Sequence, residues 1–298
     1  MGEQFWWFYD VIVAAVVLIC IFLTVRKGIL KASAAIVAYI FAVFISFSLS
    51  TTFAERITES ALYGSNVKKM NYTISENDYA AELSSQLNGL GYYIKVDRDK
   101  IEEFYLSGED VDNKIYTYIK NMHSKQFDDE ETFLLKLHNC YAVSASNFIA
   151  KKLSPYSAEY AAEQIRNNPE KYWQFMKLLS DDYSTKTAAE FLVRNYIQPP
   201  YTTLIRLVIY IIAFVILLII FLLIAHSFSR NDHTENGFFT IFLRIIIGIG
   251  KAAAIILAIA VLVRLNVITG DNKMLFFNHE AIDKTYIFKY FYSFIRTW

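Results

Sequence analysis

The chain contains 298 residues, of which 55% are hydrophobic and 16% aromatic, while only 19% are charged. A soluble domain with this composition would have too little polar surface to cover its core, so the sequence favours a membrane protein. The 29 basic residues balance the 29 acidic residues. A chain without net charge has no bulk attraction to nucleic acid, which excludes nucleic acid from the expected partners.

Four apolar runs are predicted to cross a lipid bilayer as helices. A helix needs about 20 residues to cross roughly 30 Å of hydrocarbon with all its backbone amides satisfied. The runs gather at the two ends of the chain and cover residues 11–25, 32–50, 207–225 and about 245–263. The first run follows an aromatic group at residues 6–9, as expected at a membrane interface, and it lacks the basic start of a signal peptide. We therefore expect this run to be retained.

Basic residues predict the orientation of the spans. Arg26, Lys27 and Lys31 lie in a very short loop between the first two runs, and such loops are cytoplasmic by the positive-inside rule. The N-terminus, the central residues and the tail after residue 264 are then expected outside, with the loop at residues 226–237 inside. The opposing observation is that the tail is itself basic, with Lys273, Lys284, Lys289 and Arg296, whereas the second inner loop has Arg230 and the nearby Arg244.

An internal repeat links the second and fourth runs. Residues 28–38 align without gaps to residues 248–258, and the identical pairs are Gly28/Gly248, Ile29/Ile249, Lys31/Lys251, Ala32/Ala252, Ala34/Ala254, Ile36/Ile256 and Ala38/Ala258. Small residues allow helices to approach closely, and each lysine is placed to reach the inner interface. The match indicates two related hairpins, although membrane helices share much of this composition. On this interpretation Lys251 marks the inner start of the fourth helix, and residues 238–250 form a lead-in that is either amphipathic or half-inserted in the membrane.

The central residues are predicted to form a soluble helical domain inserted between the second and third spans. Their apolar residues recur at helical spacing and are interrupted by capping residues. Ser75 is expected to cap a helix that ends at Asn88-Gly89, and Asp97 to open a short helix. The acidic run at residues 128–131 favours a solvated helix start over a cation site.

Prolines mark the remaining boundaries of this domain. Asn168-Pro169 is typical of an N-cap and first helical turn, and Pro199-Pro200 is expected to form a stiff elbow into the third span. Residues 92–96 alternate like a short strand, but no second run is available to pair with them. The sequence thus predicts an all-α membrane protein with a first hairpin at residues 1–51, a helical domain at 52–203, a second hairpin at 204–265 and an amphipathic aromatic tail at 266–298.

The sequence offers no set of residues for catalysis, metal binding or cofactor binding. The histidines lack the spacing of a zinc protease, and His138 and Cys140 point in different directions on a helix. Charged residues near the spans are better functional candidates, because burying a charge in lipid costs a few kcal/mol. These are Asp10, Arg206, Arg244 and Lys251, and each lies near enough to a helix end to act as an interfacial anchor instead of a transport site.

The membrane runs resemble one known family. An aspartate before the first span, the turn Arg26-Lys27-Gly28 and a glycine-rich approach to the fourth span are similar to the colicin V production (CvpA) family of bacterial inner-membrane proteins. The tail after Ile282 resembles the aromatic ending of Gram-positive members. The resemblance covers roughly residues 5–55 and 204–298, and it does not extend to the inserted domain. It brings no catalytic residue, cofactor or metal, and its motif positions here are Asp10, Gly28, Lys31, Gly248 and Lys251.

The resemblance implies a non-catalytic, multi-pass protein of the cytoplasmic membrane that supports toxin production or export and envelope maintenance. Its partners would be the lipid bilayer and, through the outer domain, envelope or secretion proteins. The alternative is a small transporter or channel built from the repeated hairpin, which would have to form a homo-oligomer to line a path. A membrane-anchored enzyme is the weakest hypothesis, because no nucleophile and base are found together. The tail is expected either to lie on the outer membrane surface or to pack against the inserted domain.

Overall fold

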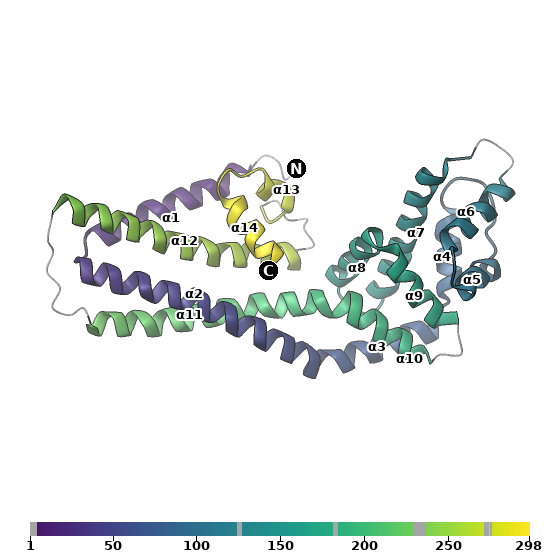
Figure 1. The fold of residues 1–298 in the computed structure, drawn as a ribbon, viewed down its shortest axis with the longest axis horizontal. Helices are drawn as coiled ribbons and strands as arrows, with labels where there is room; N and C mark the ends of the chain where they lie inside the picture. The colour runs from purple at the N-terminus through teal and green to yellow at the C-terminus, as the bar shows by residue number, and fades with distance from the viewer. Residues whose placement is uncertain (1–4, 124–126, 181–183, 229–236, 271–273, 275) are drawn as a thin grey trace. The chain divides into compact units, whose positions relative to one another are not determined.

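The computed structural model describes residues 5–123, 127–180, 184–228, 237–270, 274 and 276–298 (Figure 1). Within these ranges every regular element is a helix, which confirms the all-α prediction, and no strand is formed by residues 92–96. The chain divides into two compact units, one made of Met1–Arg56 with Thr203–Trp298 and the other of Ile57–Thr202. We call them the membrane unit and the helical unit.

Among the described residues, four helical runs are long and apolar enough to cross a membrane, namely Trp7–Val25, Ile29–Glu76, Thr185–Ser227 and Phe238–Thr269. They contain α1 (Trp7–Val25), α2 (Ile29–Ile57), α11 (Gln198–Phe228) and α12 (Phe238–Thr269). Large apolar side chains on these helices face outward, with Leu18, Phe44 and Leu223 exposed by 67%, 69% and 65%. Apolar surface on this scale is unfavourable in water and favourable in lipid, so the structure supports a multi-pass membrane protein.

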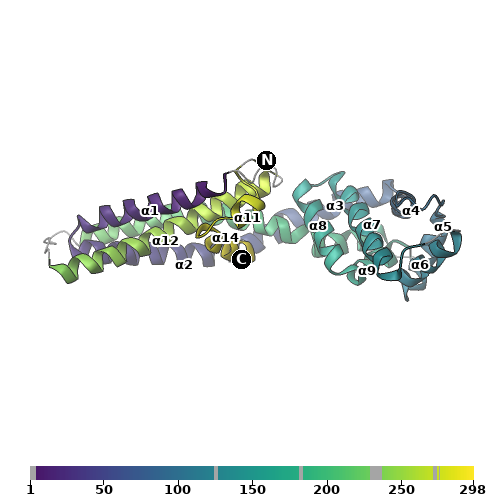
Figure 2. The ribbon, with the colours of Figure 1, turned by 90° about the horizontal axis from the view of Figure 1, so that it is seen from above.

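The most extensive helix packing in the membrane unit joins α1 to α12. These helices are the first and the last of the four, and they lie side by side in both views (Figures 1 and 2). Two successive hairpins would instead pair α1 with α2 and α11 with α12. The small residues of α2 form a buried stripe of Ala32, Ala35, Ala38 and Ala42, which allows neighbouring helices to approach it closely.

The expected elbow at Pro199-Pro200 is absent, and the helix continues through both prolines. α10 (Thr185–Leu192) is followed by the π-helical turn η3 (Val193–Ile197) and then directly by α11. A proline inside an α-helix loses one hydrogen bond and clashes with the carbonyl four residues earlier. A wider π-helical turn changes that hydrogen-bond pattern just before the prolines, so the helix accommodates them. A second π-helical turn, η2 (Thr58–Leu62), lies between α2 and α3.

The helical unit surrounds one apolar core. Its other helices are α3 (Tyr63–Glu76), α4 (Tyr79–Asn88), α5 (Arg98–Ser107), α6 (Val111–Met122), α7 (Glu130–Ala150), α8 (Pro155–Asn167) and α9 (Pro169–Ser180). The long helix α7 packs against α8, α4 and α6, while α3 packs against α10. Fully buried aromatic residues such as Phe133, Tyr141 and Phe175 fill the space between the helices.

Most of the predicted caps of this unit are confirmed, and one is wrong. The Asp97 and Asp129 side chains accept the N–H groups of Asp99 and Thr132 at the starts of α5 and α7, and the Asn168 side chain accepts Lys171 N–H. Ser75 is not a cap, because it lies inside α3. The N-cap of α4 is Asp78, whose side chain accepts Ala81 N–H at 3.0 Å. Both residues are good caps by type, and the extended backbone at Asp78 selects it.

The tail forms the short helix α13 (His279–Asp283) and the amphipathic helix α14 (Phe288–Thr297). α14 belongs to the membrane unit, where Phe288, Tyr292 and Ile295 are buried and the helix packs against α12 and α1. The opposite face exposes Tyr290 and Phe294. The tail therefore packs on membrane-spanning helices, a position that neither sequence-based alternative included.

Candidate functional site

The motif residue Asp10 links the start of the chain to its tail. From the first turn of α1, Asp10 Oδ2 accepts Tyr286 N–H at 2.7 Å, and Oδ1 accepts the N–H groups of Ile287 and Phe288 at 3.0 and 3.1 Å. The first amides of a helix have no partner within the helix, and a carboxylate is also attracted to the positive end of the helix dipole. Asp10 is therefore the cap of α14, although 276 residues separate it from Tyr286.

Aromatic contacts hold both ends of α14 in the membrane unit. Near its start, the Tyr9 ring stacks on Phe288 with centroids 4.7 Å apart, and the Tyr9 hydroxyl donates to the Phe276 carbonyl at 2.7 Å. At its end, Trp298 stacks on Phe47 with centroids 4.0 Å apart, and Arg206 donates a hydrogen bond to the Trp298 carbonyl. Arg206, expected as an interfacial anchor, thus also holds the tail.

The motif residue Gly248 packs directly against the backbone of α1. A Cβ atom at this position would lie 2.7 Å from Ile21 Cα and 3.2 Å from the Cys20 carbonyl oxygen. Such distances leave no room for any side chain, because the backbone of α1 occupies the space. Gly248 is therefore the residue that permits the α1–α12 contact, as small residues do at other membrane-helix crossings.

Two basic residues of α12 are buried beside the C-terminal end of α1. Arg244 is 1% exposed and donates to the Val25 carbonyl at 3.2 Å, while Lys251 is 6% exposed and its ammonium lies 3.5 Å from the Thr24 hydroxyl. The last carbonyls of a helix have no partner within the helix and carry its negative dipole end. The two cations therefore complement the end of α1.

The two copies of the repeat occupy different positions in their helices. Gly28 is buried in the turn just before α2, where its carbonyl accepts Ala32 N–H at 2.9 Å, and Lys31 lies in the first turn of α2. Gly248 and Lys251, by contrast, lie well inside α12. The prediction that Lys251 marks the start of the fourth helix is wrong, because residues 238–250 contain no helix-breaking proline and form one continuous helix with the rest of the span.

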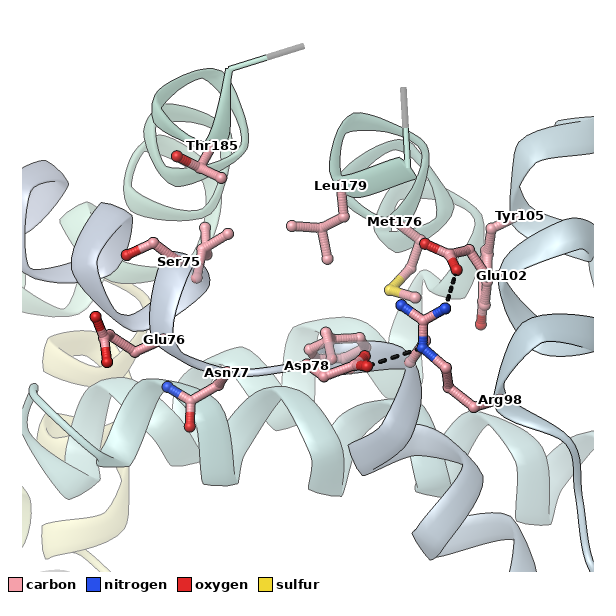
Figure 3. Close-up of a pocket in the computed structure, with 13 residues that line it drawn as sticks. Ser75, Glu76, Asn77, Asp78, Arg98, Glu102, Tyr105, Met176, Leu179 and Thr185 are labelled. Carbon is pink, nitrogen blue, oxygen red and sulfur yellow. Dashed lines mark hydrogen bonds and ion pairs between the residues drawn. The ribbon is translucent and has the colours of Figure 1, made fainter. Parts of the chain in front are cut away.

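The helical unit contains a pocket of about 380 Å³, a volume in the range of small-ligand sites (Figure 3). Its lining residues are Ile74, Ser75, Glu76, Asn77, Asp78, Tyr79, Ala80, Arg98, Glu102, Tyr105, Met176, Leu179 and Thr185. Figure 3 shows polar side chains on two sides of the pocket, with Met176 beside Arg98 and Leu179 between the two polar groups. The pocket thus combines charged groups with an apolar surface.

Arg98 is the central charge of this pocket. Its guanidinium lies between Asp78 and Glu102 (Figure 3), donating to Asp78 Oδ2 at 2.8 Å and to the Glu102 carboxylate, and it also pairs with Asp99 at 2.9 Å. Burial alone would raise the pKa of the Asp78 carboxyl, but hydrogen bonds from Ala81 N–H and Arg98 lower it below its ordinary value. The ion pair between Asp78 and Arg98 thus joins the start of α4 to α5 at the pocket wall.

A second polar network joins α6 to α7 inside the helical unit. The Asp112 carboxylate lies 2.6 Å from His138 Nε2 and accepts the Tyr141 hydroxyl at 2.8 Å. Cys140 is 4% exposed, and burial raises the pKa of its thiol to about 11. His138 is therefore bonded to Asp112 while Cys140 faces the core, and no group of three or more potential metal ligands occurs within the described ranges.

Comparisons of the chain with protein-family models, with curated proteins and with solved structures give no match. The fold itself defines a class, the all-helical proteins with four candidate membrane-spanning helices. Within that class, the residues of the chain itself are the evidence for its function.

Sequence reasoning selected several polar residues of the membrane unit but missed how they are used. Asp10, Arg206, Arg244 and Lys251 were expected at interfaces, and all four contact distant segments of the chain. Thr24 was not selected, since a threonine near a helix end is common. Its burial at 2% beside Lys251 is visible only after α1 and α12 are paired.

Proposed function

We propose that this chain is a non-catalytic, multi-pass protein of the bacterial cytoplasmic membrane, similar to the CvpA family, in which a fixed membrane unit presents the helical unit outside the cytoplasm. There the helical unit binds an envelope component or a secretion protein during toxin export or envelope maintenance. The repeat is interpreted as a trace of two related membrane segments. The proposal rests on the residues of the chain alone.

The observation that carries the proposal is the set of contacts that the charged residues of the membrane unit make with other segments of the chain. Asp10 caps α14, Arg206 holds Trp298, and Arg244 and Lys251 contact the end of α1. A transport path requires charged groups that face a water-filled cavity. Charged residues that connect helices are expected instead in a membrane anchor. These contacts therefore argue against the transporter alternative, in which Lys31 and Lys251 would bind a solute.

The distribution of basic residues supports the proposed orientation. Arg26 and Lys27 follow α1, and Arg244 and Lys251 contact the last residues of the same helix. With Lys31 in the first turn of α2, five basic residues thus lie toward one end of the membrane unit, the side to which the sequence also assigned them. The basic residues of the tail, Lys284, Lys289 and Arg296, lie toward the other end and oppose this orientation. The positive-inside rule favours a cytoplasmic position for the end with five basic residues, and this supports the proposal that the helical unit lies outside the cytoplasm.

Cysteine labelling in intact cells tests the orientation. Exposed serines are available in α5, α11 and α14, and Ser107→Cys, Ser227→Cys and Ser293→Cys are made in a chain without Cys20 and Cys140. We expect a membrane-impermeant thiol reagent to label positions 107 and 293 but not 227, and lysed cells to label all three. Labelling of position 227 alone in intact cells would invert the molecule and move the search for partners to the cytosol.

Blocking the pocket of Figure 3 tests the role of the helical unit. Ser75 is exposed on the pocket wall, so Ser75→Trp fills the opening without disturbing the core. We expect this variant to fold, to reach the membrane and to fail to restore toxin export or envelope integrity in cells that lack the protein. Ser85→Trp, at an exposed position of α4 outside the pocket, is the matched control and should restore both. Full restoration by Ser75→Trp would contradict a role for this pocket.

A further inference from the structure

The described carboxylates of the membrane unit all lie away from the turn between α1 and α2. They belong to Asp10, Glu55, Glu280 and Asp283, which lie at the start of α1, near the end of α2 and in the tail. Basic residues occur at both ends of the unit, and those toward the turn between α1 and α2, which we call the basic end, are Arg26, Lys27, Lys31, Arg244 and Lys251. Arg26, Lys27 and Lys251 form no ion pair with a carboxylate of the described residues. Among the described residues, no carboxylate therefore neutralises these three cations at the basic end.

Lys251 gives the strongest reason to expect an external anion. Its side chain is more than nine-tenths buried, and its ammonium reaches one neutral oxygen, Thr24 Oγ1, at 3.5 Å. The positive charge of Lys27 acts on it from nearby and opposes its own. A buried ammonium is costly unless an opposite charge and good hydrogen bonds compensate it. The end of α1 and a long contact to a hydroxyl supply only part of that compensation, since neither carries a full negative charge.

Arginines complete the basic end. Arg244 reaches the same end of α1 through the Val25 carbonyl, and Arg26 lies in the adjoining turn with its guanidinium 3.9 Å from the Phe22 ring centroid. Guanidinium and ammonium groups together form the usual protein environment of a phosphate. Because the turn lies at the end of a membrane-spanning helix, the phosphate within reach is that of a lipid headgroup.

An apolar groove begins at the same end of the membrane unit. It has a volume of about 750 Å³ between α2 and α11, and it is lined almost wholly by apolar side chains, from Leu30 and Ala34 to Phe41 on α2 and by Phe221 and Ile224 on α11. Leu30 is the second residue of α2, two positions after the buried Gly28. The groove is therefore placed to hold an acyl chain whose headgroup lies at the α1–α2 turn.

We infer that the basic end of the membrane unit binds the phosphate of an anionic phospholipid, with Lys251 and Lys27 as the principal cations and Arg26 and Arg244 beside them. The acyl chain lies in the groove between α2 and α11. The site is independent of the export role proposed above, since it concerns how the membrane unit is seated in lipid.

Lipid binding by the full chain in mixed detergent micelles tests this inference. Native mass spectrometry measures the apparent affinity for dioleoylphosphatidylglycerol, with dioleoylphosphatidylcholine and inorganic phosphate as separate probes. A basic residue at the membrane surface contributes about 1 kcal/mol to binding of anionic lipid, which corresponds to about a fivefold change in affinity. We expect Lys251→Gln and Lys27→Gln each to weaken phosphatidylglycerol binding about fivefold and to leave phosphatidylcholine binding unchanged.

The control variant is Lys289→Gln, which removes one positive charge from α14, a tail helix that Asp10 caps at the start of α1. It should bind phosphatidylglycerol like the unmodified chain. Lys27 is exposed in a turn, so Lys27→Gln still tests the site if Lys251→Gln fails to fold. Equal binding of both lipids would overturn the inference, as would unchanged phosphatidylglycerol affinity in Lys27→Gln. Displacement of phosphatidylglycerol by millimolar inorganic phosphate would identify a free-anion site and would overturn the assignment to lipid.

Discussion

Replacing Gly248 by alanine is expected to destabilise the membrane unit by about 2 kcal/mol, within the usual range for overpacking of 1–3 kcal/mol. The new Cβ would lie 2.7 Å from Ile21 Cα, so α1 and α12 would have to move apart along their contact. The neighbouring atoms belong to the backbone and cannot rotate away. Unfolding of the purified chain in mixed micelles, followed by helical circular dichroism against increasing SDS, measures the loss.

Gly250 provides a matched control in the same helix. A Cβ at this position would meet the end of the Ile36 side chain, with Cδ1 at 3.0 Å, and that end can change rotamer. Alanine also favours a helix over glycine by about 0.5–1 kcal/mol. Gly250→Ala should therefore change stability by less than about 1 kcal/mol. If the two variants lost the same stability, the close contact at Gly248 would not be what holds α1 against α12.

Removing the Asp10 carboxylate is expected to release α14 from the membrane unit. Asp10→Ala leaves the N–H groups of Tyr286, Ile287 and Phe288 without their acceptor, and loss of a cap costs about 1–2 kcal/mol. Amide hydrogen exchange at residues 286–290, measured by mass spectrometry on the full chain, should become about tenfold faster, because 1.4 kcal/mol corresponds to a factor of ten. Asp10→Asn keeps one acceptor oxygen and should give a smaller increase.

Asp283 is the control for this experiment, since it is also a carboxylate in contact with the tail. It is 60% exposed and lies 4.0 Å from Arg296, and an exposed ion pair of this kind contributes little to stability. Asp283→Asn should leave exchange in α14 unchanged. Unchanged exchange in Asp10→Ala as well would show that the aromatic contacts of Tyr9 and Trp298 hold α14 without its cap.

Local features of the fold were predictable from the sequence because they depend on neighbouring residues. The caps Asp97 and Asn168 are short polar side chains before helical stretches, and the spans are long apolar runs. The elbow at Pro199-Pro200 was predicted wrongly, because the π-helical turn η3 that accommodates the prolines depends on packing over many residues. A proline pair by itself carries no signal for such a turn.

The pairing of helices was not predictable by the same route. Gly248 and its neighbouring alanines indicate that some helix comes close, but the sequence does not say which one. The repeat with residues 28–38 favoured two sequential hairpins, whereas the most extensive contact is between α1 and α12. Similarly, Asp10 was selected by its type and position, while its partners in α14 follow only from the three-dimensional packing.

The α1–α12 contact also determines when the membrane unit can be completed during synthesis. Ile21 and Gly248 are 227 residues apart (248 − 21), which at about 5–20 residues per second separates their translation by roughly 10–45 s. During that interval α1 lacks its partner, whereas the helical unit already has its own core and can fold first. The α1–α12 contact can therefore form only after the helical unit has been made, so the membrane unit is completed last.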